Sequence, residues 1–201
     1  KLLKNKNLIK LRNIDIIFCI GSTQIIPKKI LNLPKLGCLN IHPSLLPKYR
    51  GRFSTLRSIL NGDKETGVTA HFIGKEIDMG RIIIKKKINI PSSFTAKDLY
   101  DRFELEGILI FKKIVNMLKR GHKIKTYNIK KIKGRGFKYY KKELPNDGEI
   151  NWKWSGKKIK NFIRAFSFEP FHPPYFYIGK KKMVIVDEKL LKKNFFFDTP
   201  K

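Results

Sequence analysis

The chain has 201 residues, 41% of them hydrophobic, so it can bury a substantial core and is not a disordered protein. We find no signal-peptide pattern and no apolar run near the roughly 18 residues of a membrane span, which favours a cytoplasmic protein. The formal net charge is +29, and lysine far outnumbers arginine. Such a charge fits a polyanionic partner such as nucleic acid, but its spread along the chain favours a general compositional drift toward lysine.

The first 121 residues predict an α/β domain. Apolar runs and turn residues predict a strand over residues 14–20, a short helix before Pro34, a strand over 37–41, a helix over 52–61, and strands over 67–73 and 81–90. The first strand–helix–strand spacing is typical of a parallel unit in a doubly wound sheet. The order of elements therefore indicates a layered α/β architecture.

The longest predicted helix closes this domain. Thr95 is the expected N-cap, acidic residues come early, basic residues come late, and Gly121 ends the helix. Its apolar residues predict one broad buried stripe, made of Leu99, Phe103, Leu105, Ile108, Ile114, Val115 and Leu118.

The remainder of the chain predicts a basic linker and a small module. Residues 122–142 carry nine cations and no acidic side chain. A run of this kind favours a solvated linker, with contact to a phosphorylated substrate as the alternative. Residues 143–201 predict a small α+β module, with a hairpin that turns near Gly179 and a helix whose buried face carries Ile159, Phe162, Ile163 and Phe166.

The two cysteines lie in apolar, strand-like runs. Cys19 and Cys38 have neither the spacing of a zinc site nor an obvious disulfide partner. We expect both to be reduced and buried.

One stretch contains candidate catalytic residues: CLNIHPSLLPKYRG, residues 38–51. Asn40 and His42 end a strand and project to the same side, and two prolines stiffen the loop after the strand. An amide beside an imidazole suits acyl transfer, because the amide can bind an oxyanion while the imidazole handles a proton. Asp78, in a glycine-flanked loop after another strand, can join them. No serine or cysteine nucleophile accompanies them, so the nucleophile is an external amine or water.

Three segments resemble the 10-formyltetrahydrofolate-dependent formyltransferases: NIHPSLLPKYRG, GDKETGVTAHFIGKEIDMGRII and DGEINWKWSGKKIKNFIRAF. The resemblance implies a Rossmann-like, mostly parallel sheet whose first strands precede Lys1, with catalytic domain 1–121, linker 122–142 and C-terminal domain 143–201. It implies transfer of a formyl group from 10-formyltetrahydrofolate to an amine, without a metal.

The resemblance also implies roles for individual residues. Asn40, His42 and Asp78 match the family's catalytic asparagine, histidine and aspartate, and we expect Asp78 to favour a protonated His42. The residues that match the folate-binding segments are Gln24, Ile25, Ile26, Ser44, Leu45, Leu46, Pro47, Gly74, Lys75, Glu76 and Ile77.

The acceptor amine stays open between branches of the family. RFSTLRSI after Gly51, the AHFI strand and the compact C-terminal module favour an amino sugar on a nucleotide, whereas the basic linker suits initiator methionyl-tRNA. A glycinamide ribonucleotide enzyme has no such module and is disfavoured. A nucleic-acid-binding module without catalysis is disfavoured by the intact Asn40, His42 and Asp78. The oligomeric state is left open, with a homodimer among the alternatives.

Overall fold

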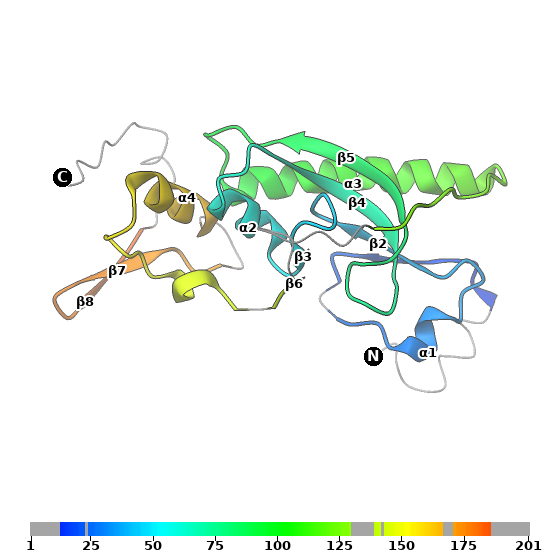
Figure 1. Cartoon of the computed structure of the whole chain (residues 1–201), viewed down its shortest axis with the longest axis horizontal. Helices are drawn as coiled ribbons and strands as arrows, with labels where there is room; N and C mark the ends of the chain where they lie inside the picture. The colour runs from blue at the N-terminus through cyan, green and yellow to red at the C-terminus, as the bar shows by residue number, and fades with distance from the viewer. Residues whose placement is uncertain (1–12, 23, 130–138, 142, 167–170, 186–201) are drawn as a thin grey trace.

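The computed structural model describes residues 13–22, 24–129, 139–141, 143–166 and 171–185 (Figure 1). The elements in chain order are β1 (Ile17–Ile20), α1 (Lys28–Leu31), β2 (Cys38–His42), β3 (Arg50–Gly51), α2 (Ser54–Leu60), β4 (Glu65–Phe72), β5 (Ile82–Asn89), α3 (Ala96–Lys119), β6 (Tyr139–Tyr140), the 3-10 turn η3 (Pro145–Gly148), α4 (Gly156–Phe166), β7 (Tyr175–Ile178) and β8 (Lys181–Val184). Each helix and strand predicted from the sequence overlaps one of them.

A four-stranded sheet in the order β1-β2-β4-β5 forms the centre of the fold. β1 and β2 run parallel, as the strand–helix–strand spacing predicts. β4 pairs with β2 and with β5 in antiparallel fashion, so the described part of the sheet is mixed. The register of β2 on β4 places Asn40 opposite His71 and His42 opposite Thr69.

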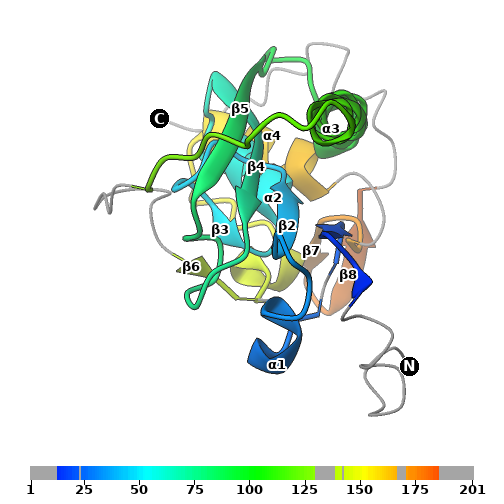
Figure 2. The same cartoon turned by 90° about the vertical axis from the view of Figure 1, so that its right-hand side faces the viewer.

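α3 lies along one face of this sheet, and Figure 2 looks down its axis beside β4 and β5. The helix begins at the predicted N-cap with a capping box. The backbone N–H of Asp98 donates to the Thr95 hydroxyl, and the Thr95 N–H donates to the Asp98 carboxylate. These bonds satisfy donors that a helix start otherwise leaves without partners.

The predicted buried stripe of α3 is only partly right. Leu99, Phe103 and Ile114 are buried against the core. The prediction was wrong for Leu105 and Ile108, which are 56% and 52% exposed. Leu105 follows Phe103 by two residues, which turns it about 200° around the helix and away from the sheet.

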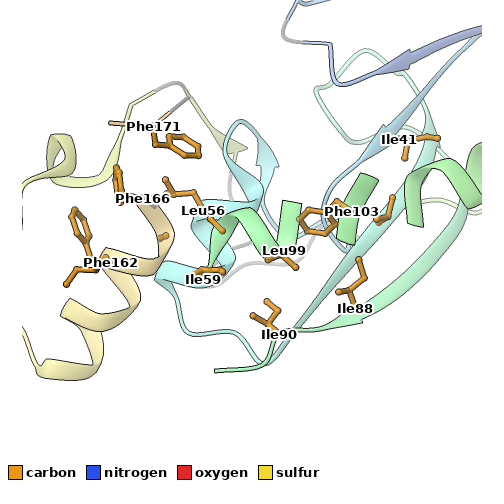
Figure 3. Packing of buried hydrophobic residues seen from close by; sticks show 14 of the residues in the cluster. Ile41, Leu56, Ile59, Ile88, Ile90, Leu99, Phe103, Phe162, Phe166 and Phe171 are labelled. Carbon is orange, nitrogen blue, oxygen red and sulfur yellow. The ribbon is translucent and has the colours of Figure 1, made fainter. Parts of the chain in front are cut away.

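The C-terminal module shares one hydrophobic core with the sheet through α2. The face predicted for α4 is confirmed: Ile159, Phe162, Ile163 and Phe166 are all buried. Figure 3 shows Phe166 and Phe171 beside Leu56 of α2. The Arg164 guanidinium, at the end of α4, donates to the Phe94 carbonyl just before α3, at 2.7 Å.

The predicted hairpin is also present. β7 and β8 pair antiparallel, and Gly179 turns between them at a φ of +57°, a left-handed conformation that glycine adopts without steric cost. Part of the predicted linker, residues 130–138 and 142, lies outside the described residues. Its two described ends both pair with earlier parts of the chain: Tyr127 bridges to Ile82 of β5, and β6 pairs in parallel with β3.

Both cysteines are buried and free, in line with the expectation of reduced thiols. Burial raises the pKa of Cys38 to about 11, and the neighbouring Cys19 adds to this, so the thiol of Cys38 stays protonated. Among the described residues, no helix combines the length and hydrophobicity needed to cross a membrane.

Candidate active site

Two neighbouring strands bring an amide and an imidazole together. Asn40 on β2 and His71 on β4 are directly opposite, so their side chains leave the same face of the sheet. Asn40 Nδ2 lies 3.3 Å from His71 Nε2, and His71 Nδ1 lies 2.9 Å from the Phe72 carbonyl oxygen. Because a carbonyl only accepts, Nδ1 carries the proton and Nε2 accepts from the Asn40 amide. One N–H of Asn40 is thereby oriented, and the amide has a second to offer to an oxygen.

His42 sits two residues further along β2, on the same face as Asn40. Its side chain is buried, and Nε2 lies 2.9 Å from the Tyr49 carbonyl oxygen. This carbonyl also only accepts, so Nε2 is the protonated nitrogen of neutral His42. Nδ1 then carries the lone pair, and it points toward Asp78 at 3.7 Å from Oδ2.

The loop between β4 and β5 delivers Asp78. A Cβ on Gly80 would lie 1.6 Å from the Phe72 carbonyl oxygen, so only glycine allows the loop to close this tightly. Asp78 itself has a φ of +53°, a left-handed conformation that is strained for a non-glycine residue. Its Oδ1 lies 3.6 Å from His71 Nε2, and its Oδ2 accepts from the Gly51 N–H at 2.7 Å.

Burial and charge act against each other on the two titrating groups. Burial alone would raise the pKa of Asp78, but the two histidines and the Gly51 N–H outweigh it and lower that pKa to about 2. For His42, burial is the dominant influence and lowers its pKa, although Asp78 and the Tyr49 carbonyl act in the opposite direction. The expected influence of Asp78 is present, because its charge favours the protonated form of His42, but burial outweighs it and the net direction of the His42 pKa is downward.

The structure thus brings Asn40, His42 and Asp78 into one cluster around His71. Their catalytic roles stay a prediction. His71 is the member that was not predicted, although a histidine inside the largely apolar strand VTAHFI, on the strand that pairs with β2, was a usable signal. The carbonyl of Tyr49 and the N–H of Gly51 were also missed, because backbone contacts depend on the folded chain.

The Ser44–Pro47 segment, expected to bind folate, is anchored to the sheet. The Thr69 hydroxyl donates to the Ser44 carbonyl at 2.6 Å and accepts from the Leu46 N–H at 3.1 Å. The Lys85 ammonium also donates to the Leu46 carbonyl. The side chains of Ser44 and Leu46 are buried, whereas Leu45 and Pro47 are half-buried.

The other residues expected to bind folate lie on two more loops. Gln24 and Ile25 are exposed and Ile26 is half-buried, in the loop between β1 and α1. In the Asp78 loop, Gly74 is half-buried, and the exposed residues are Lys75, Glu76 and Ile77. No described group of His, Cys, Asp and Glu has the arrangement of a metal site. The folate-binding roles of these residues stay predictions.

Comparison with known proteins finds two kinds of relative. The methionyl-tRNA formyltransferase of Wigglesworthia glossinidia brevipalpis is 32% identical over 195 residues, which are 97% of this chain and 59% of that protein. The GDP-perosamine N-formyltransferase of Brucella melitensis is 34% identical over 173 residues, 83% of this chain and 62% of that protein. The chain therefore spans about three fifths of the length of each.

A solved structure shows the same fold. The N-formyltransferase of Helicobacter canadensis, solved with folinic acid and dTDP-3-aminofucose, superposes with a TM-score of 0.70 at 29% identity, covering 85% of this chain and 62% of that one. This match confirms the predicted fold class.

Two family models match the chain itself. The formyl transferase model matches residues 3–114, and the model of the formyl transferase C-terminal domain matches residues 144–196. The first match alone covers more than half of the chain and includes every residue of the cluster around His71. The resemblance seen in the sequence is thereby confirmed: the chain belongs to the formyl transferase family.

Proposed function

We propose that this protein transfers a formyl group from 10-formyltetrahydrofolate to a primary amine on a nucleotide-linked sugar. The observation that carries the proposal is the cluster of Asn40, His42 and Asp78, in a chain of the formyl transferase family. An oriented amide, a neutral imidazole and an ionised carboxylate are the groups that acyl transfer to an amine needs.

The amide stabilises the negative charge that develops on the oxygen of the formyl group. As the amine nitrogen bonds to the formyl carbon, the carbonyl oxygen becomes an oxyanion, and the second N–H of Asn40 donates to it. The contact between Asn40 Nδ2 and His71 Nε2 fixes the orientation of the amide, and the other N–H of the same nitrogen is the donor that we assign to this charge. The donor is in place before reaction, so no reorganisation is needed as the charge develops.

The imidazole and the carboxylate transfer the proton that the attacking amine loses. Neutral His42 takes a proton from the attacking amine at Nδ1, and the resulting imidazolium is stabilised by Asp78 and by the Tyr49 carbonyl. The carbonyl then re-forms while the bond between the formyl carbon and the folate nitrogen breaks. The proton passes to that nitrogen, which leaves as a neutral amine. The lowered pKa of His42 supports this role, because it keeps the base unprotonated at neutral pH.

The nature of the acceptor rests on the comparisons. The sugar enzymes of Brucella melitensis and Helicobacter canadensis act on or were solved with a nucleotide-linked sugar, and both match over more than four fifths of this chain. This similarity favours an amino sugar acceptor.

Initiator methionyl-tRNA is the second candidate. The methionyl-tRNA formyltransferase of Wigglesworthia matches 97% of this chain, and the net charge of +29 suits a polyanionic acceptor. A tRNA enzyme displaces many counterions on binding, so its affinity falls steeply with salt, whereas a nucleotide sugar with few phosphates gives a shallow dependence.

The remaining features stay predictions. They are the division into residues 1–121, 122–142 and 143–201, a cytoplasmic location and a homodimer.

The test is a transfer assay with 10-formyltetrahydrofolate and a panel of acceptors: GDP- and dTDP-linked amino sugars, charged initiator tRNA and glycinamide ribonucleotide. We expect formylated product from an amino sugar with the native protein and none with Asn40→Ala. Product from tRNA alone, with a steep salt dependence, would transfer the assignment to the second candidate. Folate turnover unaffected by Asn40→Ala would remove the cluster from the reaction.

A further inference from the structure

The backbone of residues 49–51 touches both members of the His42–Asp78 pair. The Tyr49 carbonyl accepts from His42 Nε2 at 2.9 Å, and two residues later the Gly51 N–H donates to Asp78 Oδ2 at 2.7 Å. His42 comes from β2 and Asp78 from the loop between β4 and β5, so this tripeptide is a bridge between two separate parts of the fold. The 3.7 Å separation of the pair therefore depends on where the tripeptide lies.

The Tyr49 side chain fixes the tripeptide on its far side. It is buried, with 1% of its surface exposed. Its hydroxyl donates to Asp63 Oδ2 at 2.7 Å and accepts from Asn61 Nδ2 at 2.8 Å. The Lys48 ammonium lies 3.2 Å from the same Asp63 oxygen. Asp63 and Asn61 belong to the turn after α2, so the hydroxyl ties the tripeptide to a third part of the fold.

The Tyr49 backbone would not hold this shape on its own. Its φ is +52°, a left-handed value that is strained for a non-glycine residue and persists only where the surroundings enforce it. Gly51, two residues on, also has a positive φ, of +87°. The anchored hydroxyl and the buried ring supply that enforcement.

We propose that Tyr49 and Asp63 are positioning residues for the reaction: their hydrogen bond holds the Tyr49 carbonyl where it keeps the proton of His42 on Nε2 and the lone pair of Nδ1 toward Asp78. This inference rests on the proposed function, since it assigns how the base of that reaction is oriented. Neither residue touches the reacting atoms, and both act through the Tyr49 carbonyl.

The chemical consequence comes from the two nitrogens of imidazole. A neutral histidine carries one proton, and in His42 only Nε2 has an acceptor within hydrogen-bonding distance: the Tyr49 carbonyl lies 2.9 Å from Nε2, whereas Asp78 Oδ2 lies 3.7 Å from Nδ1. If the Tyr49 carbonyl moves away, the ionised Asp78 becomes the strongest acceptor nearby and draws the proton to Nδ1. His42 then has no lone pair facing the cluster, and it cannot accept a proton from a substrate there.

The first test reads the tautomer directly and needs no substrate. Nitrogen NMR of histidine-labelled protein distinguishes the two tautomers, and the four histidines are few enough to assign with His42→Asn and His71→Asn. We expect His42 to be protonated at Nε2 in the native protein and at Nδ1, or exchanging between both, in Tyr49→Phe. Tyr177→Phe, which removes an exposed hydroxyl in β7, is the matched control and leaves the spectrum unchanged.

The second test is kinetic. Tyr49→Phe keeps the ring and removes only the hydroxyl, so we expect kcat to fall about 10- to 100-fold, as misplacement of a catalytic group does, with KM for both substrates changed by less than about twofold. Asp63→Asn keeps an acceptor oxygen and should retain more activity than Asp63→Ala. Asp15→Asn, at an exposed aspartate, is the control for the charge change and leaves kcat unaltered.

The outcomes separate this inference from the proposed function. An unchanged His42 tautomer in folded Tyr49→Phe and Asp63→Ala, as judged by circular dichroism, overturns the positioning role even if formyl transfer is confirmed. A changed tautomer supports it even if no acceptor in the panel is formylated. If Tyr49→Phe does not fold, Asp63→Asn and Asp63→Ala still decide the question, because they leave the buried ring in place.

Discussion

The cluster around His71 and the C-terminal module are stabilised by different interactions. Beside the apolar residues of β2 and β4, four of the buried side chains in this region are polar and hydrogen-bonded: His42, Ser44, Thr69 and His71. Around α4, rings pack on rings: Trp154, Phe162, Phe166 and Phe171. The two regions therefore contribute differently: hydrogen bonds between buried polar groups fix the orientation of the side chains, whereas the buried rings contribute most of the apolar burial.

This contrast predicts that the aromatic region dominates stability. Phe162 is buried between Trp154 and Phe166, with ring centroids at 5.1 and 4.6 Å. Phe162→Ala should therefore lower the free energy of unfolding by about 3–5 kcal/mol, measured by urea denaturation. Ile178→Ala, at an exposed site on β7, should change it by less than about 0.5 kcal/mol. An equal loss in the free energy of unfolding at the two sites would contradict the prediction that the aromatic region dominates stability.

The polar cluster should show the reverse pattern. Asn40→Ala should lower kcat by about 10²- to 10³-fold, equivalent to roughly 3–4 kcal/mol of activation free energy, through loss of an oxyanion donor. The free energy of unfolding should fall by only about 1 kcal/mol, the net value of one hydrogen bond. Steady-state kinetics and denaturation of the same preparation measure both quantities. Asn116→Ala, on the exposed side of α3, is the control and should alter neither.

A pH series tests the same contrast in another way, through the titration of Asp78 in the polar cluster. The pKa of Asp78 is lowered to about 2 from an ordinary value of 3.8. A carboxyl whose folded pKa is lowered stabilises the protein above its unfolded pKa and loses that contribution as the pH falls through its folded pKa. The stability advantage of the native protein over Asp78→Asn should thus shrink by about 2 kcal/mol between about pH 5 and pH 2.

Unfolding of both proteins by urea at several pH values checks this. Asp15→Asn, at an exposed ion pair with Lys35, should parallel the native protein to within about 0.5 kcal/mol across the series. A constant difference between the native protein and Asp78→Asn down to pH 2 would show that Asp78 is not ionised beside the histidines.

The smallest effect is expected away from both regions. Thr95→Ala removes the N-cap of α3 and should lower the free energy of unfolding by about 1 kcal/mol, since the capping box loses one of its two partners. Thr95→Ser keeps the hydroxyl and should recover most of that loss. Thermal unfolding by circular dichroism measures both variants, and no recovery with serine would place the effect in packing rather than capping.

Much of the fold could be predicted from local patterns. The capping of α3, the buried face of α4 and the turn at Gly179 depend on residues that are neighbours in sequence. The antiparallel direction of β4 could not be predicted, because it depends on how the chain returns after α2. The outward turn of Leu105 and Ile108 shows a further limit of the prediction: the presence of hydrophobic residues does not by itself tell which side of a helix packs against the sheet.

The site was predictable in part for the same reason. Asn40 and His42 are two residues apart on one strand, and Asp78 comes after a recognisable strand and glycine. His71 becomes a member only through strand pairing, and the protonation of His42 depends on burial that no local pattern reveals. The contributions of Tyr49 and Gly51 come from main-chain atoms, which any residue type possesses.

The pairing of β3 with β6 has a consequence for how the two halves of the protein communicate. β6 lies in the segment that joins α3 to the C-terminal module, and its partner strand ends at Gly51, whose N–H holds Asp78. The connector therefore lies against the main chain that steadies the carboxylate. Because β6 is hydrogen-bonded to β3, a displacement of the connector reaches the Gly51 N–H and the Asp78 carboxylate that it binds.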